Sequence, residues 1–150
     1  MTIKRVLLEE RCRVVQLLDE GGLPVVDITP EKLNDFFSFS LQATVVGIIG
    51  LENRGSEGLL RSLVVTESCR GQGIAAKLLG FLETYAVEQG INTLYLLTEN
   101  GEAFFAKYGY VGTGRDSVPV AIQQTDEFLS ICPDDALCMK KEINSPRYKK

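Results

Sequence analysis

The stretch LRSLVVTESCRGQGIAAKLLGFLETYAVEQG, residues Leu60–Gly90, decides the fold. Its first part contains the β-branched apolar run Leu63–Val65, which is typical of a buried strand. A polar turn follows, in which Gly71 and Gly73 give the backbone conformations that other residues avoid. Apolar residues then recur at helical spacing until Gly90, a common helix terminator. We therefore predict a strand, a glycine turn and an amphipathic helix in direct succession.

The turn before this helix is a candidate phosphate site. The first amides of a helix have no acceptor within the helix, and they lie at the positive end of its dipole. Arg70 adds a positive charge at the same place. The alternative at this point is a strand-to-helix turn that uses its glycines for structure alone and binds no ligand.

The spacing of the glycines separates three phosphate-binding patterns. A Walker loop needs Lys-Ser or Lys-Thr after the second glycine, and Ile74-Ala75 stands there, so this pattern is excluded. Gly71, Gly73 and Ala76 fit the dinucleotide pattern G-x-G-x-x-A, and Glu99 follows the next predicted strand. However, four residues separate the strand from the first glycine, and a repeated βαβ array is lacking. A third pattern, Arg/Gln-x-x-Gly-x-Gly/Ala, fits without a gap.

Composition excludes several classes of function. The chain has 150 residues, 45% of them hydrophobic and 24% charged, and we expect one domain, 1–150, with a frayed tail at 144–150. The net charge of −4, without a large basic block, makes nucleic acid a poor partner. No histidine is present, so histidine-based catalysis is excluded, and four cysteines without C-x-x-C spacing argue against a metal site.

Hydrophobic runs are too short for a membrane. None approaches the roughly 20 residues that span a bilayer. The apolar run at Val6–Leu8 ends at Glu9-Glu10, which is too short for a secretion signal. We therefore expect a cytoplasmic protein with no membrane partner.

Periodicity and turn residues predict the remaining elements. We expect Cys12, Val15, Leu17 and Leu18 on the inner face of the first helix, and Ala103, Phe104 and Tyr108 on that of the third. The expected order is an edge strand at 2–7, helices at Glu9–Glu20 and from Thr29, a meander of strands at Phe36–Leu41, Thr44–Leu51 and Leu59–Thr66, the central helix, a strand at Thr93–Thr98 parallel to Leu63–Thr66, a helix at Asn100–Tyr108, a strand from Tyr110, an amphipathic stretch at Val118–Phe128 and a last strand at Leu137–Ile143. This order predicts an α+β fold with a mixed, mostly antiparallel sheet and helices on both faces.

Arg70, Gly73 and Ala75 meet the third phosphate pattern, and the match resembles the acetyl-CoA signature of the GNAT superfamily of N-acetyltransferases. The order of elements from Leu8 to Ile143 is also the order that this family implies. Other segments that resemble the family are LLRSLVV, LYLLT and FFAKYGY. The closing AIQQTDEFLSICPDDALCMKK is similar to the arsenic-resistance-associated N-acetyltransferases and, more distantly, to the acetyltransferase domain of N-acetylglutamate synthases.

The resemblance implies a GNAT-like fold with a splayed parallel strand pair and acetyl-CoA as the acetyl donor. It places the backbone of Leu63, Val64 and Val65 along the pantetheine arm. The residues that it assigns to the pyrophosphate are Arg70, Gly71, Gln72, Gly73, Ile74 and Ala75, and those on the far side of the cofactor are Asn100, Phe104 and Phe105.

Acid and base roles follow the family less closely. The tyrosine that commonly protonates the leaving thiolate aligns with Phe105, which has no proton to give. Tyr108, one helical turn further on, is the candidate acid, and core packing is its alternative role. Ser62 and Thr98 align with hydroxyl or thiol positions of the glutamate-synthase-like enzymes and are candidate polarising groups.

Two charged residues are candidates for the acceptor side. Glu52 ends a predicted buried strand and is the candidate base for the acceptor ammonium, with a solvated strand end as its alternative. Arg61 is the candidate ligand for an acceptor carboxylate, unless strand alternation directs it to solvent. The arginines that are expected to bind a glutamate side chain have no counterpart near Ile131–Asp135. Glutamate is therefore a poor candidate for the acceptor.

We therefore hypothesise direct acetyl transfer from acetyl-CoA to the amine of a small amino-acid-like acceptor, including an arsenical one. The alternative is a catalytically weak GNAT-like module that binds or senses acyl-CoA. A dinucleotide enzyme is the third hypothesis. The last strand offers an edge for a homodimer.

Overall fold

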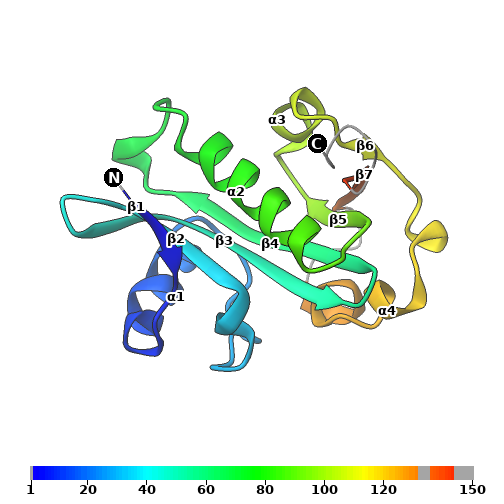
Figure 1. The fold of residues 1–150 in the computed structure, drawn as a ribbon, viewed down its shortest axis with the longest axis horizontal. Helices are drawn as coiled ribbons and strands as arrows, with labels where there is room; N and C mark the ends of the chain where they lie inside the picture. Colours follow the sequence, from blue (N-terminus) through cyan, green and yellow to red (C-terminus); the bar gives the residue numbers. More distant parts are fainter. Residues whose placement is uncertain (1, 132–135, 144–150) are drawn as a thin grey trace. The chain divides into compact units, whose positions relative to one another are not determined.

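The computed structural model describes residues 2–131 and 136–143. The chain divides into two compact units, one formed by Met1–Glu52 and Arg61–Tyr85 and the other by Asn53–Leu60 and Ala86–Lys150. The expected single domain stays a prediction. Figure 1 labels the main elements: β1 (Thr2–Arg5), α1 (Arg11–Glu20), β2 (Phe36–Leu41), β3 (Thr44–Arg54), β4 (Glu57–Val65), α2 (Ile74–Glu88), β5 (Thr93–Thr98), α3 (Glu102–Lys107), β6 (Val111–Gly112), α4 (Val120–Gln123) and β7 (Leu137–Glu142). Short 3-10 turns lie at Leu8–Glu10, Lys32–Asp35, Glu67–Cys69 and Arg115–Ser117, and a π-helical turn at Glu127–Ile131.

Strands β1, β2 and β3 of the first unit are antiparallel neighbours. Phe37 of β2 lies opposite Ile49 of β3, and the register shifts after Phe39. Gln42 and Ala43 join the two strands with φ angles of 50° and 66°. Positive φ at two central residues is the conformation of a tight hairpin turn whose twist matches the strands. The predicted turn and the antiparallel pairing of these strands are confirmed.

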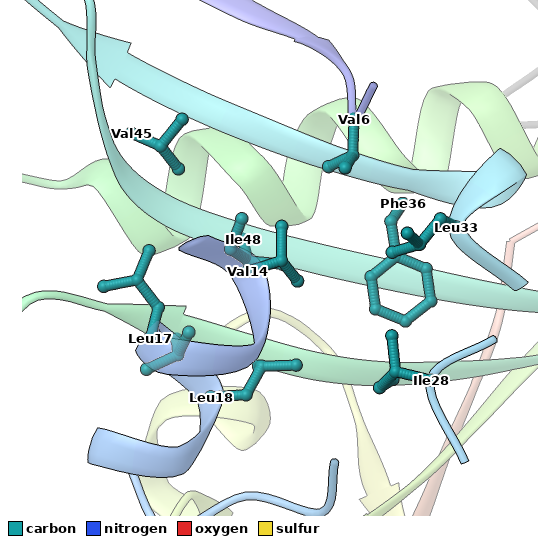
Figure 2. Close-up of a cluster of buried hydrophobic side chains, with 10 residues drawn as sticks. Val6, Val14, Leu17, Leu18, Ile28, Leu33, Phe36, Val45 and Ile48 are labelled. Atoms are coloured by element: carbon teal, nitrogen blue, oxygen red, sulfur yellow. The ribbon is translucent and has the colours of Figure 1, made fainter. Parts of the chain in front are cut away.

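Helix α1 covers one face of the first unit with its apolar side (Figure 2). The buried cluster consists of Val6, Val14, Leu17, Leu18, Ile28, Leu33, Phe36, Val45, Ile48 and Val64. Cys12, which we expected on this inner face, is exposed. Val14, Leu17 and Leu18 follow the i, i+3, i+4 spacing of one helix face, and Cys12 lies about 200° around the helix from Val14.

Helix α2 covers the opposite face of these strands. Phe36 belongs to the core under α1, whereas the ring of Phe37 meets the ring of Phe81 on α2 with a centroid distance of 5.0 Å. Neighbouring residues of a strand point to opposite faces, so the two helices lie on either side. A Cβ on Gly47 of β3 would lie 3.0 Å from Leu78 on α2, so glycine allows the helix to approach closely.

In the second unit, β4 and β5 form a parallel pair. Glu57–Leu59 pairs with Thr93–Tyr95. The predicted parallel pairing of these two strands is confirmed, but the paired residues lie at the beginning of β4 and not at Leu63–Thr66, where we expected them. The amide of Asn92 donates a 2.7 Å hydrogen bond to the carbonyl of Ser56, which fixes the register at the beginning of β4.

The other strand pairs of the second unit are antiparallel, with β7 between β5 and β6. Its core consists of Leu59, Tyr95, Val118, Ile122 and Cys138. The predicted last strand is confirmed as far as Glu142, and the expected tail 144–150 lies outside the described residues. The predicted mixed, mostly antiparallel sheet is therefore confirmed.

Helix α3 buries a different side from the one expected. Phe105 is buried against the ring of Tyr110, at a centroid distance of 5.6 Å. Ala103 is exposed, and Phe104 and Tyr108 are half-buried. The helix begins at residue 102, two residues later than predicted, and has only six residues. Phe105 lies about 100° around the helix from Phe104, so the predicted face, which contained Ala103, Phe104 and Tyr108, was wrong.

Candidate active site

The glycine loop between β4 and α2 has the backbone that the sequence predicts. Gly71 and Gly73 have φ angles of 83° and 79°. A side chain at this φ costs roughly 1–2 kcal/mol, which explains why glycine stands at both positions. A Cβ added to either glycine would meet nothing within 4 Å, so the described protein atoms leave open space there.

The amides of this loop have few backbone acceptors. The amides of Cys69 and Arg70 donate to the carbonyls of Thr66 and Glu67, and Lys77 donates the first helical bond to Gly73. In the part of the chain that the structure describes, the amides of 71–76 have no backbone carbonyl acceptor outside the helix itself. Helix α2 is 15 residues long, so its dipole adds to the positive potential at this end.

Arg70 is anchored beside these amides. Its Nε donates a 3.1 Å hydrogen bond to the carbonyl of Val65, the last residue of β4. The bond ties the guanidinium group to the strand end, although the residue as a whole is exposed. The loop thus combines backbone donors with one cation held in place, which is the arrangement that binds phosphate groups.

A cluster of four charges, three of them buried, lies in the same unit. The Nη1 and Nη2 atoms of Arg61 donate to Asp27 at 2.5 and 2.8 Å, and Nη1 also donates to Glu52 at 2.6 Å. Lys32 Nζ lies 2.7 Å from Asp27 and 3.7 Å from Glu52. The Arg61 side chain is fully buried, so the solvent-facing alternative is wrong. Glu52 is buried as well, so it is not a solvated strand end.

The charge of Asp27 depends on its partners. Burial alone raises the pKa of this carboxyl group, but hydrogen bonds from Arg61 and Lys32, together with their charges, outweigh burial and lower the pKa from 3.8 to about 2. The folded protein therefore holds Asp27 ionised over a pH range in which the unfolded chain protonates it.

This depressed pKa predicts an acid-sensitive contribution to stability. Because the folded pKa lies below the unfolded one, the contribution is complete above about pH 4 and is lost as the pH falls towards about 2. It amounts to about 2 kcal/mol. We expect the difference in unfolding free energy between wild type and Asp27→Asn, measured by urea denaturation, to shrink by that amount over this range. A difference that stays constant with pH would contradict the prediction.

Ser62 has an unusual backbone for a strand residue. Its φ is 62°, which for a non-glycine residue costs roughly 1–2 kcal/mol. Arg61 Nε donates to Ser62 Oγ at 3.1 Å, so the guanidinium group of the charge cluster also holds this hydroxyl. Non-glycine residues in such conformations concentrate at functional sites.

The candidate residues of the second unit have local partners. Thr98 Oγ1 accepts a 2.8 Å hydrogen bond from the amide of Gly101. The rings of Phe104 and Tyr108 have centroids 5.1 Å apart, and Lys107 Nζ lies 5.7 Å from the Tyr108 ring. Asn100 is exposed. The roles expected for these residues and for Phe105 stay predictions.

Within residues 2–131 and 136–143, no three His, Cys, Asp or Glu side chains are grouped so that they could hold a metal ion. The helices of that part of the chain are also too short or too polar to cross a membrane.

The sequence model of the acetyltransferase (GNAT) family matches residues 9–110. The chain belongs to this family. An uncharacterized N-acetyltransferase of Chlorobaculum tepidum is 28% identical over 109 residues, which cover 72% of this chain and 68% of the relative.

Several solved structures have the same fold. The N-acetylglutamate synthase of Neisseria gonorrhoeae, solved with coenzyme A and N-acetyl-glutamate, gives a TM-score of 0.82 at 17% identity. The alignment covers 96% of this chain but only 35% of the synthase, so this chain spans about a third of that protein. A Mycobacterium tuberculosis protein solved in complex with CoA gives a TM-score of 0.80 at 20% identity, with 95% of this chain and 99% of the other covered.

Two residues of this GNAT domain escaped the sequence analysis. Asp27 and Lys32 flank the buried Ile28 in the segment between α1 and β2. Asp27 contacts Arg61, which lies 34 residues beyond it in the chain, and Lys32 contacts Asp27 and Glu52. The sequence signal for this site was Asp27, an acidic residue inside the apolar run PVVDI. No periodicity in the sequence indicates that Asp27 contacts β4.

Proposed function

We propose that this chain transfers the acetyl group of acetyl-CoA directly to the amine of a small amino-acid-like acceptor. The observation that carries the proposal is the set of amides at 71–76, which lack a backbone acceptor outside α2 in the described chain and lie at the beginning of α2 beside the anchored Arg70. A diphosphate needs several donors at once and a positive potential. A helix N-terminus with an adjacent guanidinium group supplies both.

In the proposed reaction, the acceptor ammonium first loses a proton, and its nitrogen then attacks the thioester carbonyl. The C–N bond forms, the nitrogen gives up its second proton, the C–S bond breaks, and the thiolate of coenzyme A takes up a proton. Proximity of the two substrates supplies much of the rate in such a transfer, so no covalent enzyme intermediate is needed. We assign Glu52 as the base and Ser62 or Tyr108 as the acid, with Thr98 as a further polarising hydroxyl.

The charge cluster bears on the choice of acceptor. Arg61 already binds Asp27 and Glu52, so an acceptor carboxylate would have to share its guanidinium group with two carboxylates. This favours an acceptor whose negative charge lies away from Arg61, or an acceptor with little negative charge. The amino-acid class is supported by the Neisseria structure with N-acetyl-glutamate, and the arsenical members of that class by the similarity of the closing segment to arsenic-resistance-associated enzymes.

Calorimetric titration with acetyl-CoA tests the first half of the proposal. We expect saturable binding with a stoichiometry of one per chain, because one glycine loop supplies the diphosphate site. Titration with NADH is the control, and binding of NADH without binding of acetyl-CoA would favour the dinucleotide hypothesis.

A panel of amino acids, organoarsenicals and other amines, assayed for release of free CoA, tests the second half. Turnover with one class of amine identifies the acceptor. The alternative hypothesis, an acyl-CoA sensor, is motivated by Phe105, a residue without a proton at the expected acid position. Acetyl-CoA binding without turnover of any amine would support the sensor and refute the enzyme.

A further inference from the structure

We propose that Asp27 is a positioning residue, which acts through Arg61 to aim the hydroxyl proton of Ser62. The inference rests on the proposed acetyl transfer, in which Ser62 is a candidate proton donor. It assigns a role to Asp27, which lies in the segment between α1 and β2. In the described hydrogen bonds and ion pairs, Asp27 makes no contact with the glycine loop.

The guanidinium group of Arg61 is held on several sides. Its Nε binds Ser62 Oγ, its Nη1 binds Glu52 and Asp27, and its Nη2 binds Asp27 again. The centre of the group also lies 5.9 Å from the centroid of the Phe36 ring. These contacts fix the plane of the group as well as its position.

Phe36 in turn has a fixed support. A Cβ on Gly50 of β3 would lie 2.6 Å from the Phe36 ring, so the ring rests directly on the glycine backbone. Arg61 is thus packed between an aromatic face and two carboxylates.

Asp27 contributes most to the orientation of Arg61. It accepts from two nitrogens of the guanidinium group, and a bidentate pair fixes direction as well as distance. Glu52 also accepts from Nη1, so it shares that nitrogen with Asp27. Without the Asp27 carboxylate, the guanidinium group would keep its contacts with Glu52, Ser62 and Phe36 but would lose its bidentate partner, so its plane would be less tightly held.

The orientation of Arg61 decides where the Ser62 proton points. Because Arg61 Nε–H donates to Ser62 Oγ, the hydroxyl hydrogen must lie on another side of the oxygen. The adjacent positive charge also makes the hydroxyl a stronger donor. Loss of the plane of Arg61 would therefore free the Ser62 hydroxyl to rotate and would weaken it as a donor.

The segment that carries Asp27 has other anchors. Arg11 Nε and Nη2 donate to the carbonyl of Ile28 at 3.1 and 2.7 Å, and the Ile28 side chain is buried in the core under α1. Asp27→Asn keeps the volume of the side chain and removes its charge, so we expect the segment to stay in place. The variant thus isolates the effect on Arg61.

The kinetic test compares Asp27→Asn with wild type on the amine that the panel identifies. We expect kcat to fall about tenfold to a hundredfold, as misplacement of a reacting group does, while the dissociation constant for acetyl-CoA changes less than about twofold. Asp27→Glu should restore part of kcat. Asp19→Asn, the same change at an exposed position of α1, should leave kcat unchanged.

A double-mutant cycle separates positioning from loss of stability. If Asp27 acts through Ser62, Asp27→Asn should have little further effect on kcat in the Ser62→Ala background. An equal fall in both backgrounds, an unchanged kcat in folded Asp27→Asn, or weakened acetyl-CoA binding would overturn the proposal.

A spectroscopic readout keeps the two proposals distinguishable. In nitrogen-15 NMR spectra, wild type should show a slowly exchanging Nε–H signal of Arg61, and Asp27→Asn should lose it. If wild type binds acetyl-CoA but turns over no amine, the proposed function fails, and the role of Asp27 in Arg61 orientation is decided by this signal alone. Persistence of the slow signal in Asp27→Asn would overturn it.

Discussion

Replacing Gly73 by aspartate is expected to raise the dissociation constant for acetyl-CoA by at least about a hundredfold, or about 2.8 kcal/mol. Gly73 has a φ of 79°, directly before the first residue of α2. Aspartate is among the few residues that tolerate this φ, so the fold should survive. Its carboxylate would accept hydrogen bonds from the same amides that we assign to the diphosphate, and it would repel the diphosphate charge.

Matched variants separate charge from backbone strain. Gly73→Ala adds the strain without the charge and should weaken binding less than Gly73→Asp. Gly55→Asp adds the same charge at a glycine with a φ of 86° and open space around it, in the turn between β3 and β4, and should bind acetyl-CoA as wild type does. Arg70→Ala combined with Gly73→Asp should give no saturable binding. If Gly73→Asp is folded by circular dichroism and binds with unchanged affinity, the glycine loop is not the diphosphate site.

The glycine loop could be predicted because its signals are local. Gly71 and Gly73 need positive φ, and the apolar repeat that marks α2 begins immediately after them. The hairpin turn at Gln42-Ala43 was equally readable, since two long apolar strands flank it. Helix faces were less certain, because a helix of six residues such as α3 has too few positions to fix its phase.

The charge cluster could not be predicted, because its members are far apart in the sequence. Asp27 and Arg61 are separated by 34 residues, and an acidic residue in a connecting segment ordinarily faces water. The positive φ of Ser62 could not be predicted either, because the sequence RSLVV is typical of a regular strand. Both features depend on tertiary packing, which decides the conformation where local preferences are weak.

Arg61→Met is expected to destabilise the fold by about 3–5 kcal/mol, the largest change in stability that we predict. Methionine can fill much of the volume over Phe36, so lost packing contributes little. The main cost is electrostatic, because Asp27 and Glu52 are buried and would lose the guanidinium group that lies within 2.6 Å of each. Lys32 is near both carboxylates but cannot offer the same planar set of donors.

Urea denaturation at neutral pH measures this change, and Arg13→Met is the matched control. Arg13 donates a 3.0 Å hydrogen bond to the carbonyl of Val45, a neutral acceptor, so its loss should cost only about 1 kcal/mol. The triple variant Asp27→Asn, Glu52→Gln, Arg61→Met should recover part of the stability, because no unpaired charge is left in the core.

The pH dependence of the stability of Arg61→Met distinguishes unpaired carboxylates from lost packing. Without Arg61, one of the two groups that lower the pKa of Asp27 is gone, so folded Arg61→Met has a higher Asp27 pKa than folded wild type and loses less stability when this carboxyl group is protonated. The stability of Arg61→Met should therefore rise relative to wild type as the pH falls from about 4 towards about 2, where wild type loses the contribution of Asp27. A deficit that is independent of pH would mean that lost packing, and not unpaired carboxylates, causes the destabilisation, and the Asp27–Arg61–Glu52 cluster would then have no electrostatic role in the fold.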